Sequence, residues 1–393
     1  MKRPLIITGL ILIIFLTFCA FKVNQFYQSI YKKNTNVKKI VNKTAYTFLL
    51  LGYGGGIHEG TYLTDSMILV HIDLGKKKVL LTSIPRDIWV KLPTKSGQDF
   101  SAKINSVYQL DLFPKTYPDI DLNYPKKKGY SNLISLVLSQ ITGFQVDGYL
   151  AIDFSGFTKA IDTLDGIDID IKKAFEDPQY PIDGKETDLC GKDKEFDLIK
   201  NFITPPFNEE EKKKTLENKP DLEKFLTDIN EKPEEAFPCR YEKLVFKTGL
   251  THMDGATALK YVRSRHGIED GGDFGRASRQ QQFILAVKNK IISLGFIPKI
   301  IPLMEQMKKE IKTDISYDLV KKILQEAPNA NKYSSVNLVL STDNYLIDTY
   351  SEDGQYILIP KEGENNWSEL KKNLINIIAG ITPTPIKKTN VQE

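Results

Sequence analysis

The chain has 393 residues, of which 41% are hydrophobic and 26% are charged, as in a globular protein that buries a sizeable core. Its length exceeds that of one average domain and falls short of three. A net charge of +4 over this length argues against a nucleic-acid-binding protein, so no nucleic-acid partner is expected.

The N-terminal segment is apolar. Residues 4–21, PLIITGLILIIFLTFCAF, carry no charge, and this length just crosses about 30 Å of hydrocarbon. We therefore predict a transmembrane anchor at 4–21, a cytoplasmic N-terminus at 1–3 and a polar, Lys-rich juxtamembrane stalk at 22–45. A cleaved signal peptide and a lipoprotein site at Cys19 are alternatives, although the bulky Phe18 fits both poorly.

The next part of the chain alternates between strand and helix patterns. The expected strands are 46–51, 66–74, 76–84, 148–154 and 167–171, and the expected helices are 130–142 and 157–164. The second and third strands flank Gly75 and predict a hairpin. This pattern predicts an α/β fold: a three-layer sandwich with a central mixed β-sheet flanked by helices.

Residues 172–243 interrupt the pattern with a charged insertion that contains EEEKKK at 209–214. We expect it to be partly helical and solvated. Cys190 and Cys239 lie on either side of its middle. A disulfide between them would suit an oxidising compartment and would stabilise the fold by about 4 kcal/mol, with two free thiols as the alternative.

The C-terminal half begins with two helical segments, 256–265 and the amphipathic 276–295. The segments from 46 to 295, with the insertion at 172–243, are grouped as one domain. A C-terminal α/β extension is expected at 296–380, with a hairpin at 346–360. The Pro-, Thr- and Lys-rich residues 381–393 are expected to form a disordered tail.

Arginine is rare and unevenly placed. Only seven of the 54 basic residues are Arg, yet all four Lys or Arg residues between 263 and 279 are Arg. The planar guanidinium binds phosphate through two parallel hydrogen bonds, which Lys cannot do. This distribution predicts an anion site, and a pyrophosphate is a natural match for several guanidinium groups.

Two of the arginine segments lie where regular structure is expected to end. LTSIPRD at 81–87 places Arg86 and Asp87 directly after a strand, a common position for functional side chains. In YVRSRH at 261–266, Arg263 and Arg265 diverge if the segment is helical and point the same way if it is extended. A surface ion pair and a solvated helix end are the structural alternatives.

The third segment is GDFGRASRQQQ at 272–282, which places Arg276, Arg279 and Gln280 in the first turns of the long helix. Arg276 and Arg279 are three residues apart and share a face. A helix N-terminus attracts anions, and a cation there is unfavourable unless an anion offsets it. The segment therefore also indicates an anion site.

A glycine-rich stretch, LGYGGGIHEGTYLTDSM at 51–67, contains candidate metal ligands. Asp65, with help from Glu59 or His58, offers the oxygen-rich ligands that Mg²⁺ prefers. The stretch has no Gly-Lys-Ser/Thr and is not a P-loop, and the four histidines have no zinc spacing.

Together these segments resemble the LytR–CpsA–Psr family over about residues 46–295. The resemblance is carried by LTDSMILVHID, LLTSIPRDIWV, SAKIN, DFSGF, LDGIDIDI, MDGATALKYVRSR and GDFGRASRQQQ. It implies a single-pass cell-membrane protein whose main domain lies outside the cytoplasm. It also implies a phosphotransferase that moves teichoic acid, capsule or a similar glycopolymer from a polyprenyl-pyrophosphate donor to peptidoglycan.

The resemblance also implies roles for individual residues. The residues that match the family's pyrophosphate-binding arginines are Arg86, Arg263, Arg265 and Arg276, with Gln280 and Lys103 as their polar and basic neighbours. Asp65 matches one of two aspartates that hold Mg²⁺ or Mn²⁺. The second aspartate is expected near Gly54, where this chain has none. Either Glu59 or His58 replaces it, or Asp65 holds the metal together with phosphate oxygens and water.

Residue type and position indicate the remaining roles. We expect Arg279 to bind substrate, and Asp87 or Asp273 to accept the proton of the attacking hydroxyl. Two alternatives use the same residues: a hydrolase that cleaves the lipid pyrophosphate with water, and a non-catalytic module that binds polyprenyl phosphates or wall polymer. The absence of the second aspartate makes the non-catalytic binding module a stronger alternative than it would be with an intact motif.

Overall fold

The computed structural model describes residues 43–56, 60–203, 208–293, 311–315, 319, 322–323 and 332–381. The predicted anchor at 4–21 lies outside these residues, as do nearly all of the stalk and the tail. Within the described part, no helix is both long and apolar enough to span a membrane.

The chain divides into two compact units. The first comprises Met1–Ile167, Met253–Leu259 and Gln280–Glu393, and the second comprises Asp168–His252 and Lys260–Arg279. The polypeptide passes from one unit to the other within two helices, α10 (Gly255–Arg263) and α11 (Gly272–Ser293).

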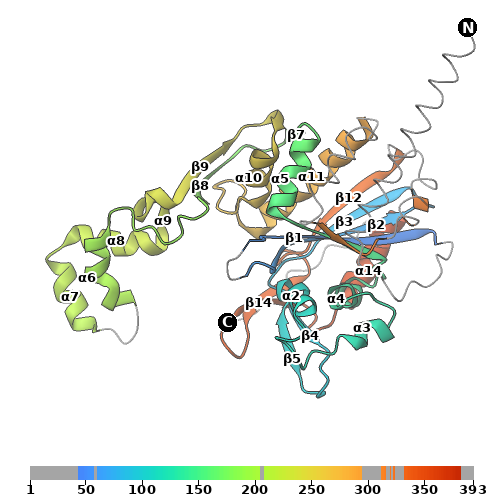
Figure 1. Cartoon of the computed structure of the whole chain (residues 1–393), viewed down its shortest axis with the longest axis horizontal. Helices are drawn as coiled ribbons and strands as arrows, with labels where there is room; N and C mark the ends of the chain where they lie inside the picture. Colours follow the sequence, from blue (N-terminus) through green and yellow to red (C-terminus); the bar gives the residue numbers. More distant parts are fainter. Residues whose placement is uncertain are drawn as a thin grey trace, which may run out of the picture. The chain divides into compact units, whose positions relative to one another are not determined.

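The first unit contains a six-stranded sheet in the order β11-β6-β1-β2-β3-β12 (Figure 1). The pairs β1–β6 and β3–β12 are parallel, and the pairs β1–β2, β2–β3 and β6–β11 are antiparallel. The predicted mixed sheet and the predicted hairpin are therefore confirmed. The strands are β1 (Ala45–Tyr53), β2 (Thr64–Asp73), β3 (Lys78–Ser83), β6 (Gly148–Asp153), β11 (Ile311–Thr313) and β12 (Ser334–Val339).

Alternating apolar residues let this sheet bury both of its faces. In β6, Tyr149 and Ala151 pack into the main core, while Leu150 and Ile152 pack with Ile311 and Ala160 on the other face. Helices cover both faces, as Figure 1 shows. The helices α2 (Val107–Leu112), α4 (Leu133–Thr142) and α14 (Ser368–Ala379) contribute to the main core, and α5 (Phe154–Thr163) lies on the opposite face.

The helix expected at 130–142 begins at Leu133, because the side chain of Asn132 caps it by accepting a hydrogen bond from the Ser135 amide at 2.9 Å. It ends at Gly143, which has the left-handed conformation typical of a helix C-terminus. Smaller elements complete this unit: β4 (Trp89–Leu92), β5 (Phe100–Lys103), a 3₁₀ turn at Ile104–Ser106 and α3 (Asn123–Lys127).

The predicted boundary at residue 295 needs correction. β11 and β12 both come from the part of the chain assigned to a C-terminal extension, yet they form the two edges of the central sheet. Trp367, Leu370 and Leu374 from the same part lie in the main core. The predicted hairpin at 346–360 is confirmed as β13 (Leu346–Tyr350) and β14 (Tyr356–Pro360).

The second unit contains the charged insertion. Strands β8 (Phe175–Pro181) and β9 (Tyr241–Phe246) form an antiparallel pair, and the helices between them are α6 (Asp193–Ile203), α7 (Glu209–Glu217), α8 (Pro220–Glu231) and α9 (Pro233–Ala236). These helices bury their own small apolar cluster, which includes Ile199, Leu222 and Phe225. The predicted disulfide between Cys190 and Cys239 is present.

The strand expected at 167–171 also forms, as β7 (Ile167–Ile171). It pairs only with β10 (Gly249–Met253), in a separate two-stranded sheet. It therefore does not extend the central sheet.

Candidate active site

In the first unit, Arg86 and Asp87 follow the end of β3, as the sequence predicted. Their backbone is held on two sides. The Arg86 carbonyl accepts a hydrogen bond from the Asn105 amide at 3.2 Å, and the Asp87 carbonyl accepts one from the Leu358 amide at 2.9 Å. The two side chains therefore start from a fixed stretch of main chain.

Four charged side chains form a continuous series around this point. Arg86 Nη1 lies 3.0 Å from Asp65 Oδ1, and Arg86 Nε lies 3.5 Å from Asp87 Oδ2. The other oxygen of Asp87 accepts a hydrogen bond from Lys103 Nζ at 2.9 Å. Four of the predicted site residues are thus brought together, with acids and bases alternating along the series.

Asp65, at the start of β2, is the predicted metal ligand that the structure describes. Its side chain is 41% exposed, and Glu59 and His58 lie outside the described residues. Within the described ranges, the single cluster of three side chains able to hold a metal is Asp188 with Cys190 and Cys239, and both cysteines belong to the disulfide. Among the described residues Asp65 is the one predicted ligand, so a Mg²⁺ ion held there would need most of its ligands from elsewhere, such as phosphate oxygens and water.

Gln280 is the first residue of α11 that belongs to the first unit. Its side-chain oxygen accepts a hydrogen bond from the Ser66 hydroxyl at 2.9 Å, and Ser66 directly follows Asp65. Gln280 on α11 is thus bound to β2 at the residue that follows Asp65, the predicted metal ligand. The next residue, Gln281, is buried and donates to Ser83 Oγ at 2.8 Å, so the helix is attached to the end of β3.

In the second unit, the other arginines lie around a segment of irregular structure, residues 264–271, which we call the arginine loop. The loop begins after Arg263, the last residue of α10, and ends before Gly272, the first residue of α11. The loop lies so close to α11 that a Cβ atom at Gly275 would be 2.4 Å from the Asp270 carbonyl oxygen. Only glycine fits there, which explains the second glycine of the GDFG motif.

Asp273, in the first turn of α11, connects two of the predicted arginines. Its Oδ1 atom lies 2.8 Å from Arg265 Nε and 3.2 Å from Arg276 Nη2. The side chain of Arg276 is only 9% exposed, whereas that of Arg265 is 37% exposed. The anion that a cation near a helix N-terminus requires is therefore supplied by the protein itself.

Arg263 is held differently. Its Nη1 atom lies 3.7 Å from Asp183, and its guanidinium lies 5.6 Å from the centre of the Tyr180 ring. Burial raises the pKa of Tyr180, so its ring stays neutral beside the cation. Arg263 and Arg265 thus take different partners, which is what their placement at and just beyond a helix end implies.

The prediction that Arg279 contacts substrate is corrected by its surroundings. The residue is 1% exposed, and its guanidinium donates to the carbonyls of Tyr261, Ser264 and Asp270 and to the Asp270 carboxylate. Burial lowers the pKa of Arg279, and the nearby Asp270 acts in the opposite direction. These contacts give Arg279 a structural role in the arginine loop.

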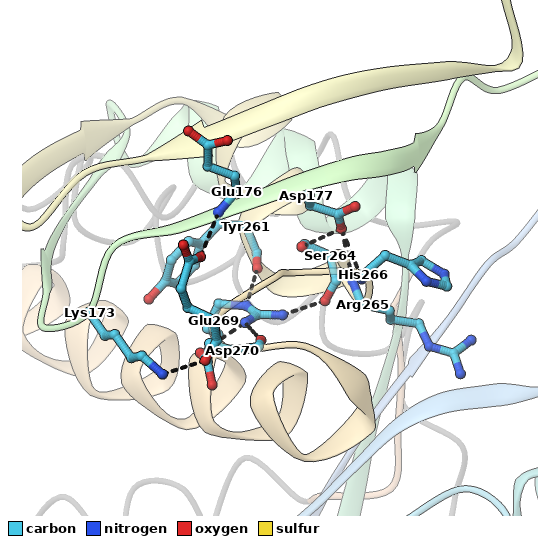
Figure 2. A network of polar contacts seen from close by, with 10 residues as sticks. Lys173, Glu176, Asp177, Tyr261, Ser264, Arg265, His266, Glu269 and Asp270 are labelled. Carbon is cyan, nitrogen blue, oxygen red and sulfur yellow. Dashed lines mark hydrogen bonds and ion pairs between the residues drawn. The ribbon is translucent and has the colours of Figure 1, made fainter. Parts of the chain in front are cut away.

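One residue in this network, Asp177 of β8, was not predicted as part of the site. Figure 2 shows its carboxylate meeting Ser264 and the backbone of Arg265 and His266. The three contacts span 87 to 89 positions along the chain, and no local pattern signals a pairing at that distance.

The fold and these residues define a class of protein: a mixed α/β protein with arginines oriented by carboxylates, and arginine is the side chain best suited to binding phosphate. The sequence profile of the LytR–CpsA–Psr family matches residues 16–373, and the chain belongs to this family.

Two curated relatives illustrate the similarity. The chain is 25% identical over 252 residues to the polyisoprenyl-teichoic acid–peptidoglycan teichoic acid transferase TagV of Bacillus subtilis, a match that covers 64% of this chain and 45% of the relative. It is 20% identical over 332 residues to the transferase TagU of Enterococcus faecalis, covering 81% of this chain and 80% of the relative. The chain thus spans about half the length of the first relative.

Two solved structures share the fold. The crystal structure of B. subtilis TagV matches with a TM-score of 0.50 and 21% identity, covering 87% of this chain and all of that one. The structure of protein gbs0355 from Streptococcus agalactiae matches with a TM-score of 0.52 and 20% identity, covering 88% and 91% of the two chains. At these identities the similarity shows the fold alone.

Proposed function

We propose that this protein transfers a glycopolymer of the teichoic acid type from a polyprenyl-pyrophosphate carrier to peptidoglycan. Family membership supports the proposal, as do the names of two relatives, both teichoic acid–peptidoglycan transferases. The observation that carries it is the pairing of Arg265 and Arg276 on Asp273, because it holds two of the arginines that match the family's pyrophosphate-binding positions in fixed orientations.

The reaction is a phosphoryl transfer. A hydroxyl oxygen of the acceptor forms a bond to the phosphorus that carries the polymer, and the bond from that phosphorus to the bridging oxygen breaks. Polyprenyl phosphate leaves, and the proton of the attacking hydroxyl passes to water. Such reactions depend mostly on positioning and on neutralising charge, which Arg86, Arg263, Arg265 and Arg276 are suited to provide.

We assign a holding role to the two aspartates that were candidates for the base. Asp87 lies between Arg86 and Lys103, and Asp273 lies between Arg265 and Arg276. Because each carboxylate contacts two cations, each fixes the direction in which those cations point. We also propose that Lys103 and Gln280 contribute to phosphate binding.

A divalent cation is part of the proposal. Asp65, with Glu59 or His58, would hold Mg²⁺ or Mn²⁺, and the ion would neutralise charge on the phosphate oxygens. Titration with Mg²⁺ after chelation should raise the thermal unfolding temperature, and Asp65→Asn should weaken that response. An equal response in both proteins would remove Asp65 from the metal site.

We propose that the main domain lies outside the cytoplasm, attached to the cell membrane by the segment at 4–21. The disulfide between Cys190 and Cys239 supports this location, since such bonds persist in oxidising compartments. Protease added to intact cells should remove the main domain, whereas protection until lysis would contradict the proposal.

The decisive assay measures the release of polyprenyl phosphate from a lipid-linked donor, with and without peptidoglycan, in the presence of Mg²⁺. The proposal expects release that depends on peptidoglycan, together with polymer attached to the wall. Release without an acceptor would identify a hydrolase instead. Binding of the donor without any release would leave a binding protein.

A further inference from the structure

Asp177 is a fully buried carboxylate in β8 with 0% exposure. Its Oδ1 atom accepts a hydrogen bond from the Gln179 amide at 2.9 Å. Its Oδ2 atom accepts three: from Ser264 Oγ at 2.6 Å, from the Arg265 amide at 3.1 Å and from the His266 amide at 3.2 Å. A charge buried this deeply is tolerated only when it is fully hydrogen-bonded, so these contacts are energetically necessary.

The carbonyl groups of the arginine loop also have a charged partner, the guanidinium of Arg279. Arg279 donates to the carbonyls of Ser264 and, at 2.7 Å, of Asp270 within the loop, and at 3.1 Å to that of Tyr261 in α10 just before it. Buried backbone groups in an irregular segment have no helix or sheet partners and need side chains instead. The Asp177 carboxylate therefore binds amides of the segment, and the Arg279 guanidinium binds its carbonyls.

One face of β8 supplies Asp177 and also packs against Arg279 of α11. Phe175 and Asp177 are two residues apart and lie on the same side of the strand. The Arg279 guanidinium stacks over the Phe175 ring, 4.4 Å from its centre. The β8–β9 pairing shifts register between Asp177 and Tyr180, so the strand is irregular where the carboxylate contacts the loop.

The backbone is held while the functional side chain points elsewhere. In Figure 2 the side chain of Arg265 extends away from the hydrogen bonds that its own amide makes. That side chain meets Asp273, which also contacts Arg276. The partners of Arg263, Tyr180 and Asp183, come from β8 and the residues just after it.

We propose that Asp177 is a positioning residue for the phosphate-binding Arg265, and that β8 is therefore part of the phosphate-binding apparatus. The proposal rests on the proposed function. If the proposal holds, β8, the first strand of the insertion, affects substrate binding directly. The solvated character predicted for the insertion did not suggest such a role.

The test compares Asp177→Asn with the wild-type full-length chain. Asparagine has one carbonyl oxygen and one NH₂ group in place of the two carboxylate oxygens. It therefore cannot accept hydrogen bonds through both terminal atoms as Asp177 does. We expect the affinity for inorganic pyrophosphate, measured by calorimetry, to fall about tenfold, with a similar rise in KM for the lipid-linked donor. Asp221→Asn, an exposed change in α8, is the matched control and should leave both values unchanged.

A second variant separates positioning from stability. Ser264→Ala removes one of the three loop contacts, and Ser264→Thr keeps the hydroxyl. The alanine variant should weaken pyrophosphate binding by a smaller factor, and the threonine variant should restore it. Combining Ser264→Ala with Asp177→Asn should add less than the separate losses, because both changes act on the same contact.

The outcomes distinguish this inference from the function on which it rests. A wild-type protein that neither binds pyrophosphate nor transfers polymer would overturn both. A functional wild-type protein with an Asp177→Asn variant that loses thermal stability but keeps its KM and affinity would overturn the positioning role alone. If Asp177→Asn does not fold, unchanged binding in folded Ser264→Ala would have the same consequence.

Discussion

Two aspartates in this protein each lie between two cations. Asp87 contacts Arg86 and Lys103, and Asp273 contacts Arg265 and Arg276. A guanidinium that is already oriented loses less side-chain entropy when it binds a phosphate. Arginine suits this arrangement because its rigid fork can contact a carboxylate on one side and a ligand on another.

Replacing Arg276 by Lys should therefore remove most of the activity. Lysine keeps the charge but cannot make two parallel hydrogen bonds, and its flexible ammonium group would not be oriented by Asp273 as the planar guanidinium is. We expect polymer transfer to fall at least about a hundredfold. The measurement is the initial rate of polyprenyl phosphate release.

Arg240→Lys is the matched control, because Arg240 lies in the insertion and stacks on Phe237 at 3.8 Å. It should retain wild-type transfer. Equal rates for Arg276→Lys and wild type would mean that two-point phosphate binding at this position is not needed.

His71 should make stability depend on pH. It is buried, stacks on Phe144 and shares a hydrogen bond with Thr47 Oγ1, and burial lowers its pKa below the ordinary 6.5. The unfolded chain therefore binds a proton below pH 6.5 that the folded chain resists. The free energy of unfolding should fall as pH drops below this value, by at most about 1.4 kcal/mol per pH unit for one proton.

Urea unfolding at pH 8, 6.5 and 5.5 would measure this slope. His71→Gln should be less stable at pH 8 but should show a smaller decrease toward acid. An identical decrease in the two proteins would assign the effect to other groups.

At the scale of elements, the insertion folds around its own small core. Its helices bury Ile199, Leu222 and Phe225, and the disulfide joins residues 49 positions apart. Loop-closure entropy for this separation gives a stabilisation of about 4 kcal/mol.

Replacing Cys190 and Cys239 together by Ser should therefore open the insertion first. We expect faster amide exchange in α6 and α8 and little change in β1 and β2, because the two regions have separate cores. Cys19→Ser should change neither. Unchanged exchange in the double variant would show that the apolar cluster alone holds the insertion.

The elements that could be predicted from sequence were those with a strong local period. The hairpin of β2 and β3, helix α4 and the β13–β14 hairpin all follow from apolar spacing and turn residues. Helix α11 begins at Gly272 and not at Arg276, so that Asp273 and Arg276 form an ion pair within the helix. The arginine loop depends on Asp177 and on a buried Arg279, and such long-range contacts leave no local pattern.

At the scale of the whole molecule, the central sheet is completed by residues far along the chain. β12 pairs in parallel with β3 over six residues, from Ser334 with Lys78 to Val339 with Ser83. Residues after 295 also supply both edges and part of the main core, which explains why a boundary drawn from the family resemblance alone was misplaced.

A chain that ends at residue 295 should therefore fail to fold. It would expose the edges of β3 and β6 and leave out Trp367, Leu370 and Leu374 from the core. We expect aggregation and no cooperative thermal transition by circular dichroism. A chain that ends at 381 is the control and should unfold like the full-length protein, and a soluble, cooperative 1–295 fragment would contradict the assignment.

The helical part of the insertion leaves and rejoins β8 and β9 at Pro181 and Tyr241, which face each other across the strand pair. In topology, the segment between β8 and β9 is one very long hairpin loop. A two-residue turn could close the same gap, and a reporter domain with adjacent termini could take its place. The protein thus offers a natural grafting point at which a fluorophore or affinity module would be carried on the same two strands.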